Sequence, residues 1–176
     1  MSSDEAATRP GELPAAFREA LARWASGVTV VTARDPEARE GDGAAPAVHG
    51  LTASSFTSVS LEPPLVLVCV SLRSHTLPVL QRARAFTVSL LGETQAPTSD
   101  HFANRPGAAA AAPSFDALGG IAGSVAVLAC DLWEDYPGGD HRILVGRVRE
   151  IALAESALAG PLLYWQRRYR YVRDEG

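Results

Sequence analysis

A run of small and hydroxyl-bearing residues between Gly50 and Ser60 carries the strongest chemical signal in the sequence. Six of its residues bear a hydroxyl group: Thr52, Ser54, Ser55, Thr57, Ser58 and Ser60. Gly50 and Ala53 add little bulk, so a ligand could approach the backbone closely and accept hydrogen bonds from N–H groups and hydroxyls. Such a segment could hold a phosphate or the polar edge of a ring. Ser and Thr clusters also decorate loops or pair across strands without a ligand, and that alternative stays open.

A histidine beside a glycine-rich turn is the second candidate. Gly138-Gly139-Asp140-His141 leads into an apolar stretch that begins at Ile143. Histidine is the side chain most easily recruited for orienting or proton-linked work near neutral pH, and Asp140 could hydrogen-bond to it. The alternative is a histidine at the edge of a turn that makes only a local hydrogen bond.

The segment Ser71-Leu72-Arg73-Ser74-His75-Thr76 is the third candidate. It follows an apolar strand and precedes a short helix, so it brings a guanidinium, hydroxyls and a helix N-terminus together, a combination that suits an anion. Capping of that helix by Ser74 or Thr76 would explain the hydroxyls equally well.

The chain contains no lysine, and all 16 of its basic residues are arginine. A Schiff base on lysine and a phosphate loop that depends on lysine are therefore excluded. A phosphate would have to be held by arginine, by hydroxyls or by backbone N–H groups. Arg73 and Arg84 are the candidates for that role.

The overall composition excludes several classes of protein. The chain has 176 residues, 47% of them hydrophobic, and a net charge of −4, which suits one globular domain without nucleic acid as a partner. No apolar run is long enough to span a membrane, and the acidic start does not resemble a signal peptide.

Cys69 and Cys130 lie in apolar runs without a CxxC pair, which indicates buried thiols in the cytoplasm. The four scattered histidines argue against a metal site.

Hydrophobic periodicity predicts the elements that position these segments. Residues 1–12 are polar and form a flexible N-terminal arm in this interpretation, and residues 13–173 form one domain. Helices are expected over residues 14–26, 77–80 and 93–104, and strands over residues 28–32, 47–60, 65–70, 85–91, 124–134 and 142–153. The stretch 65–70 is apolar at every position, which predicts a strand covered on both faces. Six strands with few short helices favour a closed or partly closed antiparallel barrel.

Taken in order, these segments resemble the flavin reductase-like family of FMN-binding split-barrel proteins. The resemblance runs from about Phe17 to Tyr171. Its strongest pieces are residues 26–32, 49–64 and 139–141, and further family-like positions are residues 86–91, 101–103 and 146–148.

The resemblance implies a mainly β protein, a six-stranded antiparallel Greek-key split β-barrel with short flanking helices. It also implies a homodimer that binds FMN or FAD near the subunit interface and reduces it with NADH or NADPH. The expected function is therefore an NAD(P)H:flavin oxidoreductase that supplies reduced flavin to a separate flavin-dependent monooxygenase. The alternative is a non-catalytic flavin-binding or electron-carrier protein on the same scaffold.

The resemblance also implies roles for particular residues. The flavin ring and ribityl chain would contact Thr52, Ala53, Ser54 and Ser55, and the phosphate would lie near Ser71, Arg73, Ser74 and Thr76. The nicotinamide would be positioned by His141, next to Asp140, with Phe102 and Tyr169 as neighbours of the same pocket. Because hydride passes directly between the two rings, the protein has to stack them and needs no acid–base pair.

Overall fold

The computed structural model describes residues 10–37, 48–106, 113–154 and 160–172. The strands are β1 (Ser26–Gly27), β2 (Thr29–Arg34), β3 (Val48–Ala53), β4 (Thr57–Leu61), β5 (Pro64–Ser71), β6 (Ala85–Leu90), β7 (Ala126–Gly138), β8 (His141–Leu153), β9 (Leu162–Trp165) and β10 (Arg168–Tyr171). The helices are α1 (Leu13–Ala22), α2 (Leu77–Ala83) and α3 (Ala96–Phe102), with 3₁₀ turns at Pro10–Glu12 and Glu93–Gln95. The expected mainly β class is confirmed.

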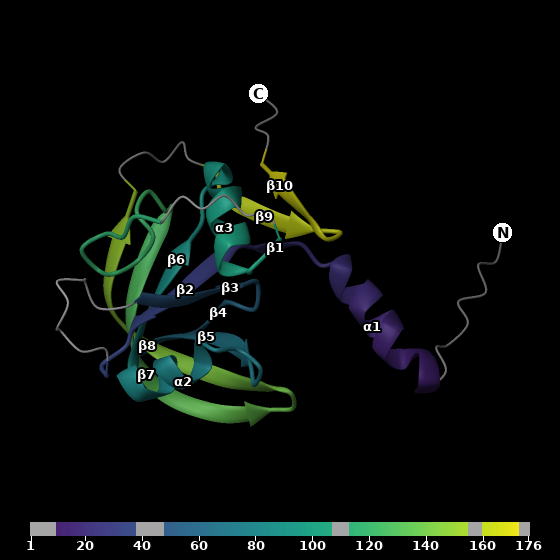
Figure 1. The fold of residues 1–176 in the computed structure, drawn as a ribbon, viewed down its shortest axis with the longest axis horizontal. Coiled ribbons are helices and arrows are strands. Elements are labelled where there is room, and N and C mark those ends of the chain that lie inside the picture. Colours follow the sequence, from purple (N-terminus) through teal and green to yellow (C-terminus); the bar gives the residue numbers. More distant parts are fainter. Residues whose placement is uncertain (1–9, 38–47, 107–112, 155–159, 173–176) are drawn as a thin grey trace.

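Seven strands form one antiparallel sheet in the order β3-β2-β6-β7-β8-β5-β4, which curls into a barrel (Figure 1). The strands β6, β7 and β8 follow one another as neighbours, and β5 lies beside β8, which is the Greek-key connection. Three further strands form a small sheet in the order β1-β9-β10. The strand count therefore exceeds the expected six.

The barrel is split between its two edge strands, β3 and β4, for which the described residues show no ladder with each other. Side chains bridge the split instead. Ser55 Oγ accepts a hydrogen bond from the Cys69 backbone N–H at 2.9 Å and donates to the Cys69 carbonyl at 3.1 Å. Thr76 Oγ1 donates to the Gly50 carbonyl at 3.0 Å. Ser55 of the hydroxyl-rich segment and Thr76 at the start of α2 thus link the barrel across this seam.

The barrel core is built from β-branched residues on alternate positions, as the period of a strand requires. In β5, Val66, Val68 and Val70 are at most 5% exposed, while Leu65 and Leu67 on the opposite face are half-buried. The expectation that both faces of this strand are fully covered is therefore wrong for the outer face. Helix α2 completes the core with Leu77, Val79 and Leu80, which are all buried.

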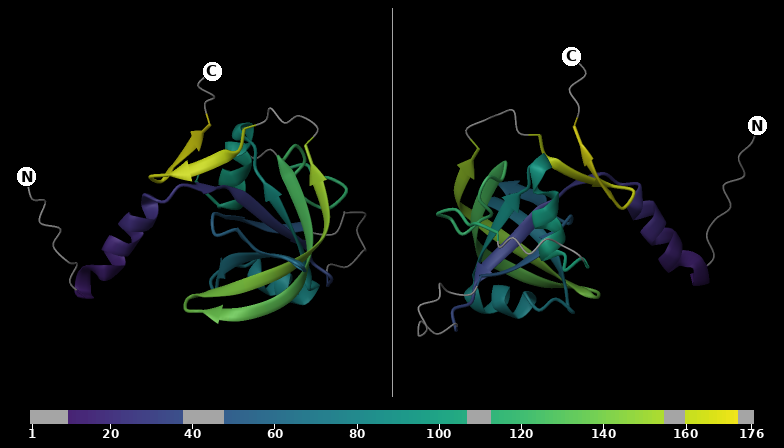
Figure 2. Two further views of the ribbon diagram at one scale, coloured as in Figure 1. Left: turned by 180° about the vertical axis from the view of Figure 1, so that it is seen from behind. Right: turned by 45° about the horizontal axis from the view of Figure 1, so that its top comes forward.

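Helix α1 extends away from the barrel, and its residues are half-buried or exposed (Figures 1 and 2). Its C-terminal end is tied to the turn between β9 and β10, because Trp165 Nε1 donates to the Arg23 carbonyl at 3.0 Å and Arg167 pairs with Glu19 at 3.0 Å. Large apolar side chains along it are more than half exposed: Leu13, Phe17, Leu21 and, just beyond its end, Trp24. None of the helices in the described ranges is long and apolar enough to cross a membrane.

Candidate functional site

The end of β3 and the connection to β4 present the hydroxyl run. Thr52 Oγ1 donates to the Ser99 carbonyl at 2.6 Å, which ties β3 to α3. Ala53 is 6% exposed, and its carbonyl accepts a hydrogen bond from Thr29 Oγ1 at 2.8 Å. Ser55 is engaged with Cys69 across the split, whereas Ser54 is exposed. Of the four residues expected at the flavin ring, Ser54 is therefore the one that presents an exposed side chain.

Two hollows meet at Ser54. A cavity of about 170 Å³ lies between the end of β3, α3 and the β9–β10 hairpin, and its wall includes Thr52, Arg105 and Tyr169. A groove of about 830 Å³ separates the β3–β4 connection from α1. Ser54 and Tyr164 line both of them. The cavity and the groove therefore adjoin along these two side chains.

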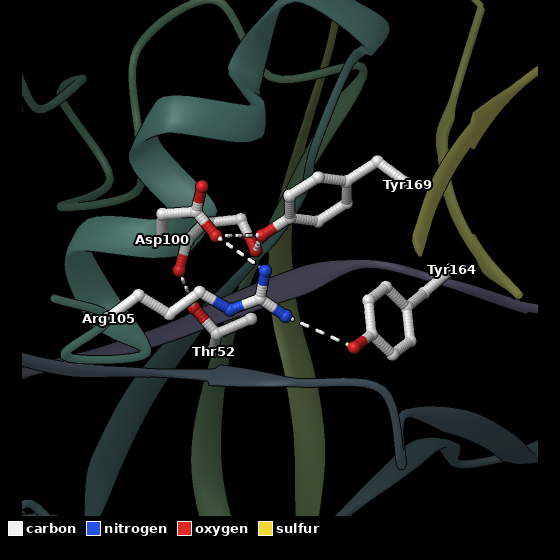
Figure 3. Close-up of polar contacts among 6 residues, drawn as sticks. Thr52, Asp100, Arg105, Tyr164 and Tyr169 are labelled. Atoms are coloured by element: carbon white, nitrogen blue, oxygen red, sulfur yellow. Dashed lines mark hydrogen bonds and ion pairs between the residues drawn. The ribbon is translucent and has the colours of Figure 1, made fainter. Parts of the chain in front are cut away.

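A polar cluster lies at one wall of the cavity, which Ser99, Arg105, Tyr164 and Tyr169 line, and Asp100 connects Arg105 with Tyr169 (Figure 3). Arg105 pairs with Asp100 at 3.2 Å and donates from Nη2 to the Tyr164 hydroxyl at 3.1 Å. Tyr169 donates its hydroxyl proton to Asp100 Oδ1 at 2.6 Å, and its oxygen also lies 2.9 Å from Ser99 Oγ. The Arg105 guanidinium carbon lies 5.3 Å from the centre of the Tyr169 ring and 5.8 Å from that of the Tyr164 ring.

The surroundings of Tyr169 and Arg105 favour one protonation state of each at neutral pH. Burial and the hydrogen bond to Asp100 raise the pKa of Tyr169, so its phenol stays protonated and remains a donor at neutral pH. Burial by itself would lower the pKa of Arg105. The interactions with Tyr169, Tyr164 and Asp100 have a larger effect in the opposite direction, so the pKa is raised. Arg105 is therefore a permanent cation at the cavity wall.

Sequence reasoning missed Asp100, Arg105 and Tyr164. Their contacts join α3 and the segment after it to the C-terminal hairpin, more than 50 residues away along the chain. No local pattern signals such a pairing. Arg105 also precedes residues 107–112, which lie outside the described residues.

The Gly-Asp-His turn lies at the tip of the β7–β8 hairpin. Gly139 has a φ of +71°, a conformation that favours glycine. His141 Nδ1 lies 2.7 Å from Asp140 Oδ1, and this hydrogen bond is the main reason why the pKa of Asp140 falls below its usual value. The His141 side chain is 41% exposed, so it is open to a ligand.

The structure brings this turn next to the expected phosphate segment. Ser71 pairs in register with His141 across β5 and β8, and the Leu72 N–H donates to the Asp140 carbonyl at 3.0 Å. Arg73 is exposed, and its charge contributes to the lowered pKa of Asp140. Ser71 and Ser74 accept hydrogen bonds from the N–H groups of Arg73 and Thr76.

Thr76 of the third segment, and Arg84 and Phe102 elsewhere in the chain, have structural partners. Thr76 is 6% exposed and is the N-cap residue of α2, but its hydroxyl donates to the Gly50 carbonyl and makes no capping hydrogen bond. Its expected contact with a phosphate stays a prediction. Arg84 Nη2 donates to the Leu132 carbonyl at 3.3 Å. Phe102 is 9% exposed and belongs to the core cluster beneath the small sheet. Its ring packs against Gly50 of β3, and its expected place beside the nicotinamide stays a prediction.

The residues expected around the nicotinamide lie in two groups. His141 and Asp140 occupy the hairpin tip, whereas Tyr169 lies in the cluster with Asp100 and Arg105. Among the described residues, no hydrogen bond or ion pair joins these two groups. In the same ranges, no group of three or more His, Cys, Asp or Glu side chains is arranged to hold a metal ion.

Comparison with known proteins identifies the family. The model of the flavin reductase like domain matches residues 21–173. The chain belongs to this family. It is 52% identical over 155 residues to the reductase component of 4-hydroxyphenylacetate 3-monooxygenase of Thermus thermophilus, an alignment that covers 88% of this chain and 94% of the relative. It is 36% identical over 176 residues to the NADH-dependent flavin reductase of a Rhodococcus species, with 94% and 93% of the two chains covered.

Solved structures show the same fold. The flavin reductase PheA2 superposes with a TM-score of 0.79 at 31% identity, covering 90% of this chain and 97% of that chain. The NADH:FAD oxidoreductase SgcE6 of Streptomyces globisporus, in complex with NAD and FAD fragments, also gives 0.79 at 31% identity, covering 97% and 99% of the two chains. These comparisons confirm the split-barrel fold.

The residues present fit a flavin. A ring system with a phosphate-bearing chain needs a concave site with a few polar groups, and the adjoining hollows have the volume of ordinary ligand sites. Ser54 and Thr57 are exposed hydroxyl residues in the groove. Arg105 in the cavity and Arg18 and Arg167 in the groove supply positive charge for an anionic ligand.

Proposed function

We propose that this protein is an NAD(P)H:flavin oxidoreductase that transfers hydride from a reduced nicotinamide to FMN or FAD. The observation that carries the proposal is the match of residues 21–173 to the flavin reductase like domain, combined with open hollows at the hydroxyl run of that domain. The names of the relatives, among them NADH-dependent flavin reductases, support NADH as the donor.

The flavin lies along the end of β3 in this proposal. Ser54 offers an exposed hydroxyl, and the small side chain of Ala53 adds little bulk. Hydrogen bonds hold the end of the strand in place, from Thr52 to Ser99 and from Ser55 to Cys69. When bound there, flavin supplies the electron-accepting ring. The protein's own task is to fix the ring's orientation and to provide hydrogen-bond donors, since hydride transfer depends on the distance and alignment of the two rings.

The nicotinamide and the phosphate are assigned to the neighbouring hairpin tip. His141, oriented by Asp140, positions the nicotinamide from an exposed turn. Arg73, with Ser71 and Ser74, is the group proposed for a phosphate, because Arg73 is an exposed cation in the same place. Thr76 supports this site by linking α2 to β3.

Two protein partners are proposed, a separate monooxygenase from the names of the relatives and a second copy of the chain from the exposed face of α1. Several relatives are named as reductase components of monooxygenases, which supports delivery of reduced flavin to a separate monooxygenase. We assign the exposed apolar side of α1 to a second copy of the chain, because Phe17, Leu21 and Trp24 are each more than half exposed beside the groove. The free thiols Cys69 and Cys130 support a cytoplasmic protein.

A turnover assay tests the enzymatic activity. Purified protein is mixed with NADH and FMN or FAD without oxygen, and the loss of visible flavin absorbance is followed. We expect catalytic bleaching in proportion to protein concentration. A rate equal to that of the protein-free mixture would refute the proposal, and tight flavin binding without turnover would favour the electron-carrier alternative.

A further inference from the structure

Among the residues that the structure describes, Arg105 is the one cation that lines the cavity next to the hydroxyl run. Both of its terminal nitrogens are held within the described structure, Nη1 by Asp100 at 3.2 Å and Nη2 by Tyr164 at 3.1 Å. Asp100 is itself fixed by the Tyr169 hydroxyl at 2.6 Å. The orientation of the guanidinium therefore depends on a chain of contacts from the C-terminal hairpin (Figure 3).

This arginine keeps hydrogen-bonding capacity toward the cavity. A guanidinium has five N–H donors, and the contacts with described residues use two of them. Its side chain is 43% exposed, so the remaining donors can reach a ligand. Thr52 and Ser54, the residues assigned to the flavin, lie in the same wall.

The surroundings of Arg105 favour a planar carbonyl edge over a phosphate dianion. Asp100 already balances the charge of the guanidinium at 3.2 Å, and the described part of the chain places no second cation in the cavity wall. A cavity of about 170 Å³ suits one end of a fused ring system, and Ser54 and Tyr164 mark its border with the larger groove. The planar fork of arginine matches two acceptors in one plane.

The pyrimidine end of a flavin presents such an edge, and its charge changes during the reaction. Hydride transfer breaks the C4–H bond of the nicotinamide and brings one proton and two electrons to the flavin ring. The reduced ring carries one negative charge, shared with its pyrimidine carbonyl, until it takes a proton from solvent. A fixed cation at this edge therefore binds the reduced ring more strongly than the oxidised ring.

We propose that Arg105 recognises the pyrimidine edge of the flavin and stabilises the negative charge that hydride transfer places there, with Asp100 and Tyr169 as positioning residues. This inference rests on the flavin reductase function proposed above. It adds Arg105 to the residues of the flavin site, and Arg105 lies outside the three candidate segments of the sequence analysis, residues 50–60, 71–76 and 138–141.

The test compares Arg105→Gln and Arg105→Lys with the wild-type protein and with Arg82→Gln. Arg82 is a matched control, because it also pairs with an aspartate at 3.0 Å and is 38% exposed, but it lies on α2 outside the cavity. Affinities for oxidised and for dithionite-reduced FMN are measured without oxygen by titration, and the same measurements are made with riboflavin. Circular dichroism and thermal melting verify that each variant is folded.

We expect Arg105→Gln to weaken binding of reduced FMN about tenfold more than binding of oxidised FMN, with the same selective loss for riboflavin. Arg105→Lys should recover part of the loss, and Arg82→Gln should behave like the wild type. Equal losses for the two redox states would overturn the inference. A loss confined to FMN would also overturn it, because Arg105 would then hold the phosphate. If wild-type protein binds no flavin, the proposed function itself fails.

Discussion

Substitution of Gly50 tests the link between the barrel seam and the site. An alanine Cβ at this position would lie 2.5 Å from Cε1 and 2.7 Å from Cδ1 of Phe102, and 3.2 Å from Cγ2 of Thr32. Phe102 is 9% exposed, so its ring has little room to move away, and Thr32 sits directly opposite on β2. Gly50→Ala therefore forces either Phe102 or β3 to shift.

The expected cost follows from these contacts. Overpacking of a tight core costs about 1–3 kcal/mol. Replacing glycine restricts the unfolded chain and returns about 0.4–1 kcal/mol. We expect a net destabilisation of about 1–2 kcal/mol, which lowers the melting temperature by roughly 2–8 °C in a protein of this size. Flavin affinity should fall as well, because Thr52 and Ser54 follow Gly50 on the same strand.

Chemical denaturation gives the free energy of unfolding, and two further variants control the experiment. Gly27→Ala is the matched control, since its Cβ would meet nothing within 4 Å, and it should stay within about 0.5 kcal/mol of the wild type. Adding Phe102→Leu to Gly50→Ala should cost less than the sum of the single changes, because the smaller side chain relieves the clash. The reasoning is refuted if Gly50→Ala and Gly27→Ala have the same stability.

Three shorter predictions concern the site, the helix and the core. His141→Asn should raise the KM for NADH or lower kcat about tenfold, while the affinity for FMN changes less than about twofold. Steady-state kinetics and a flavin titration measure these values, and a loss of FMN affinity with unchanged kinetics toward NADH would contradict the prediction. Phe17→Ser should shift the protein from dimer to monomer in light scattering, and an unchanged mass would contradict the role given to α1. Burial raises the pKa of the Cys130 thiol to about 12. Iodoacetamide at neutral pH should therefore leave Cys130 unmodified in the native protein and alkylate it after denaturation, as read by peptide mass spectrometry.

The strands of the barrel were predictable because their apolar periodicity is local. The expected strand at residues 28–32 corresponds to β2 at Thr29–Arg34, and that at residues 85–91 corresponds to β6 at Ala85–Leu90. The expected strand over residues 47–60 is two strands, because the connection at residues 54–56 turns the chain across the split. Strand β10 was missed because it is short and half of its residues are arginine, although Tyr169 packs against a core cluster.

The site was predictable where its residues are adjacent in sequence and not where they meet only in the fold. Asp140 and His141 contact each other as neighbours, at 2.7 Å, as their order suggests. The hydroxyls of Thr76 and Ser55 resemble ligand groups in sequence, but they bond to the backbone across the barrel seam. Arg105 contacts Tyr164 and Tyr169, which are distant from it in sequence. No single stretch of sequence could therefore identify Arg105 as a residue of the site.

The split in the barrel explains why two hydroxyls, those of Ser55 and Thr76, bond to the backbone at the seam. Edge strands leave backbone N–H and carbonyl groups without ladder partners, and burying such groups without hydrogen bonds costs free energy. Between β3 and β5, the Ser55 and Thr76 hydroxyls replace ladder bonds at Cys69 and Gly50. Side-chain bridges bond to fewer backbone groups than a continuous ladder would. Ser54 follows this seam, is exposed and lines both the cavity and the groove, so a ligand in either hollow can reach its hydroxyl.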